Sequence, residues 1–376
     1  MGPDRVPGGT WTRIGSLRAL RRLAGSRPAD GQQTQDQQAE RRPAGTVTAR
    51  HERIGLVLGA GGVVGAAWMT GALHAVQERL PVPAGEVDLI VGTSAGSVLA
   101  AALRCGVSLE EMVALQRGEA VPELRQAGVR DLDDGPLPPR PQLRAGSPRL
   151  MLASVLTPHR VHPGVGASAW LPRGRARHEA LRATVEALGH RRGRDGADPA
   201  PEAWADGRTW IVAVDYDTGH RAMFGREGAP RASLPDAVVA SCSIPGWYAP
   251  VVIGDHQYVD GGVRSATSLG ALARSGLDHV YVLAPMASIV ADRPARPPER
   301  LERRLRRLLT RSLLRDAELL RAQGTQVTLL TPGPEDLAAM GVNLMDPRRR
   351  VATLETSLRT VAATLAGPAG RRPQVA

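Results

Sequence analysis

The clearest candidate for chemistry is a serine between two glycines, Gly92-Thr93-Ser94-Ala95-Gly96, which follows the apolar run DLIV and precedes SVLAAAL. This order predicts a nucleophile elbow, in which glycines leave room for a sharp turn between a strand and a helix. The Ser94 hydroxyl would then lie at a helix N-terminus, where the helix dipole and the free backbone amides favour developing negative charge. Ser94 is therefore the candidate nucleophile.

A serine hydroxyl is a poor nucleophile unless a base takes its proton. The α/β-hydrolase order of serine, acid and late histidine fits badly, because the last histidine, His279, begins a predicted strand. Asp260 in the segment YVDGGV is better placed, since it ends a strand-like run, and Gly261 and Gly262 permit a tight turn after it. Its carboxylate would lie at the carboxyl edge of the sheet, and the sequence therefore predicts a Ser94–Asp260 dyad.

A carboxylate with an ordinary pKa of about 4 is a weak base for serine, so a direct dyad needs strong stabilisation of the transition-state anion. The glycine-rich run GAGGVVG, from Gly59 to Gly65, can supply it. Backbone amides at Gly61, Gly62 and Val63, freed at a turn that leads into a helix, form the candidate oxyanion hole.

The same glycine-rich run has two other interpretations. It lies in an uncharged run of 20 residues, from Ile54 to Leu73, which is long enough for a membrane span but is interrupted by glycines. A dinucleotide-binding loop needs glycines at relative positions 1, 3 and 6, and the third of these falls on Val64. The second strand also runs into Ser94 without an acidic residue at its end, so the pattern disfavours both interpretations.

Purely structural interpretations of the two candidate side chains stay open. Ser94 could be a turn serine, and Asp260 could cap an Asp-Gly-Gly turn. A protein that keeps both residues could also bind a lipid or a partner without turnover. Solvated or turn roles are expected for the other polar residues considered, which are Asp215, Asp217, Asp255, His220 and His256.

Taken together, these motifs resemble those of the patatin-like phospholipases. The resemblance rests on the glycine-rich turn, the Ser94 elbow and the Asp260 turn in this order, together with ASCSIPGWYAPV at 240–251, and it covers about 54–285. It implies a lipid acyl hydrolase that needs no metal ion or other cofactor. It also implies that Ser94 is the nucleophile, that Asp260 is its general base, and that the Gly61-Gly62 region is the oxyanion hole.

The sequence departs from the family pattern in the first of these motifs. The usual form has three consecutive glycines followed, one residue on, by a basic residue before the next glycine. Here Ala60 replaces the first glycine and Val64 replaces the basic residue. Ala60 should leave the amides usable, whereas the loss of the charge bears on substrate preference more than on the dyad.

The elements that must position these residues alternate between strand-like and helical runs. Two successive strand-turn-helix units, beginning at 54 and 87, predict an α/β fold, a three-layer sandwich with a central, mainly parallel sheet. The first strand is expected at 54–58, and helices are expected at 66–80 and 176–188. The remaining strand candidates are 209–219, 251–262, 279–285 and 326–333.

The segment 299–324 predicts a basic amphipathic helix. The favoured interpretation is a crossover helix that packs on the sheet and leaves its arginines in solvent. The alternative is a helix that lies on an anionic membrane surface. The leucines at helical spacing are Leu301, Leu305, Leu308 and Leu309.

Composition divides the chain into parts. Residues 1–50 are polar and Gln-rich and predict a disordered arm, whereas 51–285 predicts the catalytic domain. Residues 286–365 predict the helices and strand that complete the fold, and 366–376 a disordered tail. Irregular surface insertions are expected at 131–148 and 189–208, within a region, 107–206, that is expected to give access to lipid.

Composition also narrows the partners. The formal net charge of +11 comes from 48 arginines without any lysine, but one Phe and four Tyr offer little for stacking on bases, so nucleic acid is not expected. Cys105 and Cys242 cannot build a disulfide framework or a metal site. The N-terminus lacks a continuous apolar signal segment. We expect a cytoplasmic protein with a lipid or acyl ester substrate and peripheral membrane contact, and the oligomeric state stays open.

Overall fold

The structure is a computed structural model, and it describes residues 51–126, 128, 129, 142, 144–192, 204, 206–290, 292, 294 and 296–367. The predicted arm at 1–50 lies outside the described residues. So do residues 368–376 of the predicted tail and large parts of the two predicted insertions.

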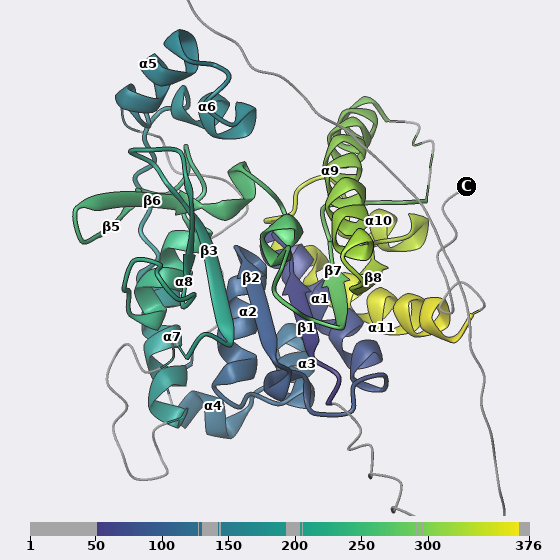
Figure 1. Ribbon diagram of the computed structural model, residues 1–376. Coiled ribbons are helices and arrows are strands. Elements are labelled where there is room, and N and C mark those ends of the chain that lie inside the picture. Colours follow the sequence, from purple (N-terminus) through teal and green to yellow (C-terminus); the bar gives the residue numbers. More distant parts are fainter. Residues whose placement is uncertain are drawn as a thin grey trace, which may run out of the picture. The chain divides into compact units, whose positions relative to one another are not determined.

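A mixed sheet of mostly parallel strands forms the centre of the fold (Figure 1). The mutually parallel strands are, in spatial order, β3 (Thr209–Asp215), β2 (Leu89–Thr93), β1 (Ile54–Leu58), β7 (His279–Leu283) and β8 (Gln326–Leu330). Antiparallel strands extend the sheet beside β3, namely β4 (Arg221–Phe224), β6 (His256–Asp260) and β5 (Val251–Ile253). All five residues of β1 are buried, as expected for a strand covered on both faces.

One face of the sheet carries the main hydrophobic core, in which Leu56 and Leu58 of β1 pack among the helices. The helices that contribute to this core are α1 (Gly62–Gln77), α2 (Ala95–Arg104), α3 (Leu109–Arg117), α4 (Pro122–Gln126), α7 (Glu179–Arg192), α8 (Leu234–Cys242), α10 (Pro334–Met340) and α11 (Arg350–Ala366). Trp68 at the centre of α1 is fully buried. The dense packing of α1 on α2 and α11 fixes the turn that precedes α1.

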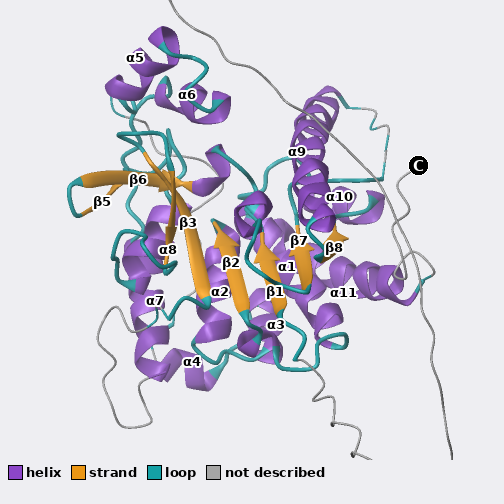
Figure 2. Cartoon of the chain, in the orientation of Figure 1, coloured by secondary structure: helices purple, strands orange, loops and turns teal. Residues whose placement is uncertain are grey.

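The opposite face carries Val57 of β1 and Val282 of β7, because successive strand side chains point to opposite faces. The long helix α9 (Pro297–Ala322) and the short η4 (Leu269–Leu272) cover it beside β7. The helices α5 (Pro148–Leu156) and α6 (Pro163–Ala169) cover Val214 of β3 on the same face. The three layers that the sequence predicts are thus confirmed (Figure 2).

Two element boundaries differ from the prediction. The first helix was expected at 66–80 but spans Gly62–Gln77, so the glycines at 62 and 65 lie inside the helix rather than in a loop before it. The run 251–262 was expected as one strand but forms the hairpin of β5 and β6, because Gly254, at a φ of +58°, turns the chain. Strand β4 was not predicted.

The region 107–206 is more regular than predicted. Instead of irregular chain around one helix, it contains α3 to α7 among its described residues. Helix α3 begins with a capping box between Ser108 and Glu111, and α5 begins with Ser147 as N-cap followed by Pro148. Helix α7 continues through residues 189–192, which were expected to begin an insertion.

Helix α9 has the expected solvated arginine face only in part, since Arg304, Arg307 and Arg311 are exposed but two other arginines are not. Its N-terminal half buries Arg303 and Arg306, whereas Leu301, Leu305 and Leu308 are 69%, 51% and 59% exposed. The two arginines are buried because acceptors meet them. Arg303 donates from Nε to Asp292 at 2.8 Å, and Arg306 donates to Glu302 and to the Pro285 carbonyl oxygen. Only the C-terminal half packs as predicted, through Leu313, Ala317 and Leu320.

Among the described residues, no helix combines the length and the apolar composition that crossing a membrane requires. Helix α9 has 26 residues, but it is rich in arginine. The uncharged run from Ile54 to Leu73 divides into β1, a turn and part of α1.

Candidate active site

Ser94 lies on the tight turn between β2 and α2, as predicted, and its side chain is buried. Its φ of 53° and ψ of −123° are strained for a residue with a side chain, which is the geometry of a nucleophile elbow. A Cβ on Gly96 would lie 2.0 Å from the Leu58 carbonyl oxygen, and one on Gly92 would lie 2.6 Å from the Gly96 carbonyl oxygen. Both flanking positions therefore require glycine.

Side chains from the following helix and from α8 hold the strained turn. The Ser94 N–H donates to Ser241 Oγ at 2.9 Å, and Ser241 in turn donates to the Val212 carbonyl oxygen at 2.6 Å. Ser97 Oγ donates to the Ser94 carbonyl oxygen at 2.6 Å. These bonds satisfy the buried backbone groups of the turn, which stabilises a conformation that is unfavourable in isolation.

Asp260 ends β6, and the Ser94 hydroxyl lies close enough to its carboxylate to lower the pKa of Asp260. Asp260 is 5% exposed, and its Oδ1 accepts a hydrogen bond from the Gly262 N–H at 2.7 Å. Burial raises the pKa of Asp260 to about 6, although the Ser94 hydroxyl, the bond from Gly262 and the electrostatic effect of His178 act in the opposite direction. Desolvation has the largest effect on the pKa of Asp260, because no cation forms an ion pair with this residue among the described residues.

The glycine-rich turn places three backbone N–H donors at the start of α1. The amides of Gly59, Ala60 and Val64 are bonded to carbonyl oxygens, the last of them to Leu344 at 3.0 Å. Among the described residues, the amides of Gly61, Gly62 and Val63 meet no acceptor, as expected at the start of α1. Gly62 has a φ of +60°, and a Cβ there would lie 2.7 Å from the Leu344 carbonyl oxygen, so this position too requires glycine.

Val64 is completely buried in the main core. It occupies the position at which the family that these motifs resemble has a basic residue. Its neighbour Gly65 approaches Pro285, with 3.3 Å left for a Cβ. The valine therefore packs against the core here, and the charge at this position of the family pattern has no equivalent on the turn itself.

An apolar cavity of about 200 Å³ begins at Ser94. Gly62 and Val63 also line it, so the free amides and the serine border one space. Most other lining side chains are aliphatic and come from α1, α2, α3 and α7. They include Ala66, Val98, Ala102, Leu115, Leu181 and Leu188.

His178 also lines this cavity, and no sequence pattern predicted it. Its ring stacks on Tyr248 with 3.6 Å between the ring centroids, and its Nε2 donates to the Cys242 carbonyl oxygen at 3.0 Å. His178 lies 82 residues before Asp260 in the chain, without a local motif, so only the fold reveals that it acts on the Asp260 carboxylate. Ser241 was equally hidden within the family-like stretch at 240–251.

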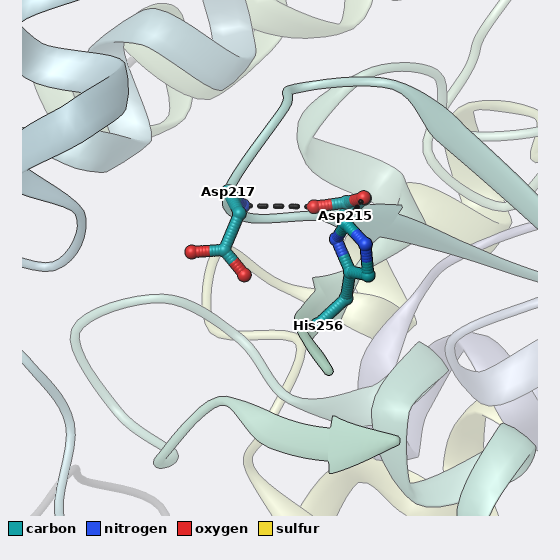
Figure 3. A group of neighbouring side chains, drawn as sticks. All are labelled: Asp215, Asp217 and His256. Carbon is teal, nitrogen blue, oxygen red and sulfur yellow. Dashed lines mark hydrogen bonds and ion pairs between the residues drawn. The ribbon is translucent and has the colours of Figure 1, made fainter. Parts of the chain in front are cut away.

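Asp215, Asp217 and His256 come together at the ends of β3 and β6 (Figure 3). Asp215 Oδ1 accepts from the Asp217 N–H at 2.8 Å, and Asp215 Oδ2 lies 2.9 Å from His256 Nδ1. Asp217 accepts from the Gln257 N–H at 2.9 Å. These bonds agree with the predicted turn roles. In the described part of the chain, this is also the group whose donor atoms, all within 4.8 Å of one another, could hold a metal ion.

The chain belongs to the patatin-like phospholipase family, whose model matches residues 56–273. Among solved structures it is similar to VipD from Legionella pneumophila, with 11% identity and a TM-score of 0.38 over 84% of this chain and 67% of that one. It is also similar to the type III effector protein ExoU, with 16% identity and a TM-score of 0.32 over 83% of this chain and 52% of that one. The chain thus spans about half the length of ExoU. No curated protein matches it.

The family match covers the Ser94 elbow, the glycine-rich turn and the Asp260 turn. Membership of the family supports the activity of a lipid ester hydrolase. The fold and the family that the sequence predicts are confirmed.

Ionisation of Asp260 should destabilise the folded protein. A pKa raised from 3.8 to about 6 means that stability is lost as the pH rises through this interval, by on the order of 3 kcal/mol at 1.36 kcal/mol per pKa unit. The neutral amide of Asp260→Asn avoids this loss. We therefore expect urea unfolding at pH 8 to give a higher midpoint for Asp260→Asn than for wild type, and equal midpoints near pH 4.

The matched control is Asp255→Asn, because Asp255 is exposed in the turn between β5 and β6. It should show no pH-dependent gain. A lower midpoint for Asp260→Asn than for wild type at pH 8 would contradict the destabilising role of the ionised carboxylate.

Proposed function

We propose that this protein is a serine-dependent lipid acyl hydrolase, an esterase or phospholipase that cleaves carboxylic ester bonds through a Ser94–Asp260 dyad. The observation that carries the proposal is that the Ser94 hydroxyl, at the edge of an apolar cavity, lies close enough to the buried Asp260 carboxylate to influence its pKa. A base with a pKa of about 6 stays ionised at neutral pH and is a stronger base than an ordinary aspartate.

In the proposed reaction, Ser94 Oγ attacks the ester carbonyl carbon while its proton passes to the Asp260 carboxylate. The amides of Gly61, Gly62 and Val63 stabilise the oxyanion of the tetrahedral intermediate. The intermediate collapses, the alcohol leaves with the proton from Asp260, and an acyl-enzyme remains on Ser94. Water then attacks the acyl group as Asp260 takes its proton, and Asp260 returns this proton to Ser94 Oγ as the fatty acid is released. The reaction needs no metal ion or cofactor.

The aliphatic lining of the cavity supports an acyl chain as the group bound beside Ser94. Side chains such as Val98, Ala102 and Leu188 offer dispersion contacts and little hydrogen bonding, which suits a hydrocarbon tail. The class of substrate is therefore a lipid or another acyl ester.

Peripheral contact with a membrane belongs to the same proposal. Leu301, Leu305 and Leu308 of α9 are exposed next to exposed arginines, and apolar and basic side chains on one helix suit an anionic lipid surface. Action in the cytoplasm belongs to the proposal as well, because two cysteines that lie far apart in the sequence, Cys105 and Cys242, cannot build a disulfide framework.

Replacing the nucleophile should abolish hydrolysis. Ser94→Ala is expected to lower the rate on p-nitrophenyl butyrate and on phospholipid vesicles by at least about 1,000-fold, because the covalent route is lost. The fold, checked by circular dichroism, should be retained. Ser275→Ala, which changes a serine outside the cavity, is the control and should keep its activity. Undiminished hydrolysis by Ser94→Ala would sink the proposal.

Activation of Ser94 should depend on an ionised Asp260. Labelling of Ser94 by a fluorophosphonate probe should rise with pH as Asp260 ionises, with a midpoint of about 6, and then stay constant. Asp260→Asn should remain folded but label at a rate that is lower by orders of magnitude, whereas the exposed Asp255→Asn should label normally. Normal labelling of Asp260→Asn would show that another base operates.

Filling the apolar cavity should change the acyl chain preference. Ala102 is nearly buried in the cavity wall, and Ala102→Leu adds three carbon atoms to it. We expect the ratio of rates on hexadecanoyl and butanoyl p-nitrophenyl esters to fall by about tenfold or more. Ala352→Leu makes the same change on the exposed face of α11 and should leave the ratio unchanged. Equal loss on both esters with Ala102→Leu would mean that the acyl chain lies elsewhere.

A further inference from the structure

A second cavity, which we call the arginine cavity, lies on the sheet face opposite the apolar cavity. It encloses about 210 Å³ between the start of α6 and the middle of α9, next to the segment that follows Asp260. Its polar lining consists mainly of His162, Arg264, Ser265, Thr267 and Arg315. Leu308 and Leu313 of α9 form part of the remaining wall.

The side chains around this cavity carry more positive than negative charge. Arg264 and Arg315 line it, and Arg221 lies close enough to Arg264 for their charges to interact. Burial lowers the pKa of Arg221, and the charge of Arg264 lowers it further. The one carboxylate that acts on this group is Asp316, which feels both Arg221 and Arg315 but is within ion-pair distance of neither in the described structure.

The pKa of His162 also responds to this excess of positive charge. Burial lowers the pKa of His162, and the charges of Arg264 and Arg221 lower it further. The positive charge therefore comes from Arg264 and Arg315 in the lining and from Arg221 beside Arg264, and Asp316 acts on Arg221 and Arg315.

Among the described residues, few acceptors meet these arginines. The buried Nε of Arg221 has no partner among the described residues. Arg264 donates to the Gly219 carbonyl oxygen at 3.4 Å, and Arg315 donates to the Arg311 carbonyl oxygen at 3.3 Å, both long bonds. Arg315 is exposed, whereas Arg221 and Arg264 are partly buried, and partial burial of guanidinium donors and charge without partners is costly. An anion in the cavity would satisfy both the charge and the donors.

The arginine cavity and the apolar cavity share one short segment of chain. Ala60 lines the arginine cavity, and its N–H donates to the Ala266 carbonyl oxygen at 2.7 Å. Gly62 and Val63 line the apolar cavity. Residues 60–63 therefore border an aliphatic space at one end and a cationic space at the other, with the free amides between them.

We propose that the arginine cavity binds a phosphate group, and that in the proposed hydrolysis it takes the headgroup phosphate of a phospholipid. The second part rests on the proposed function. In a phospholipid the phosphate is only a few bonds from the ester carbonyl, so an ester at the free amides can have its acyl chain on one side and its phosphate on the other. The guanidinium forks of Arg264 and Arg315 match phosphate oxygens, and the hydroxyls of Ser265 and Thr267 can add hydrogen bonds.

The binding test uses the full chain in phosphate-free buffer at constant ionic strength, titrated calorimetrically with inorganic phosphate and with glycerol 3-phosphate. Wild type should bind both saturably, and Arg264→Gln and Arg315→Gln should each weaken binding by at least about tenfold. The control is Arg311→Gln, which removes an exposed charge one turn earlier on α9, outside the cavity, and should change binding by less than about twofold. Absence of saturable binding to wild type, or an equal loss in Arg311→Gln, would overturn the proposal.

The second test distinguishes a lipid headgroup from free phosphate. It measures the rate on phospholipid in neutral detergent micelles, divided by the rate on p-nitrophenyl butyrate. A ratio that falls by about tenfold in Arg264→Gln and Arg315→Gln, but not in Arg311→Gln, supports the headgroup. An unchanged ratio overturns the headgroup assignment and leaves a site for free phosphate. Because calorimetry does not require turnover, failure of the Ser94 mechanism would not be mistaken for failure of the phosphate site.

Discussion

The first turn of α2 packs on the carboxyl end of β1, and the arrangement of the active site depends on this contact. The Leu58 carbonyl oxygen approaches Gly96 so closely that no other residue fits there. Since β1 continues into the glycine-rich turn and β2 into the Ser94 elbow, the contact sets where the free amides lie relative to the hydroxyl. The dense packing of α1 and α2 in the main core then holds both turns, and so supports the strained backbone of Ser94.

The buried Asp260 carboxylate follows from the same arrangement. Strand β6 lies antiparallel to β3, with Asp260 opposite Ala213, and this pairing carries the aspartate to the edge where the parallel strands end. The Ser94 hydroxyl and the Gly262 amide compensate only part of the desolvation, so the pKa rises. The same burial that should weaken the fold at neutral pH would make the carboxylate a stronger base in the proposed dyad. Stability and reactivity are therefore opposed in one side chain.

Helix α9 illustrates how local surroundings decide which face of a helix is buried. Arg303 and Arg306 are buried because they meet acceptors on Asp292, Glu302 and Pro285. The neighbouring Leu301, Leu305 and Leu308 are exposed instead. About two turns after Arg306, apolar side chains of the sheet meet Leu313 and Ala317, and the usual orientation returns. The positive charge left on this side of the sheet, around Arg264 and Arg315, contrasts with the aliphatic cavity on the other side.

The sequence alone determined the features that depend on local geometry. The Ser94 elbow, the turn after Asp260 and the fully apolar β1 were predictable because glycine spacing and strand periodicity act over a few residues. Tertiary structure decided the rest. His178, just before α7, and Ser241 of α8 reach the site without any local signal, and the aliphatic cavity exists only where several helices meet. The inverted α9 and the raised pKa of Asp260 depend on partners and on burial, which a sequence pattern does not specify because desolvation is a property of the assembled fold.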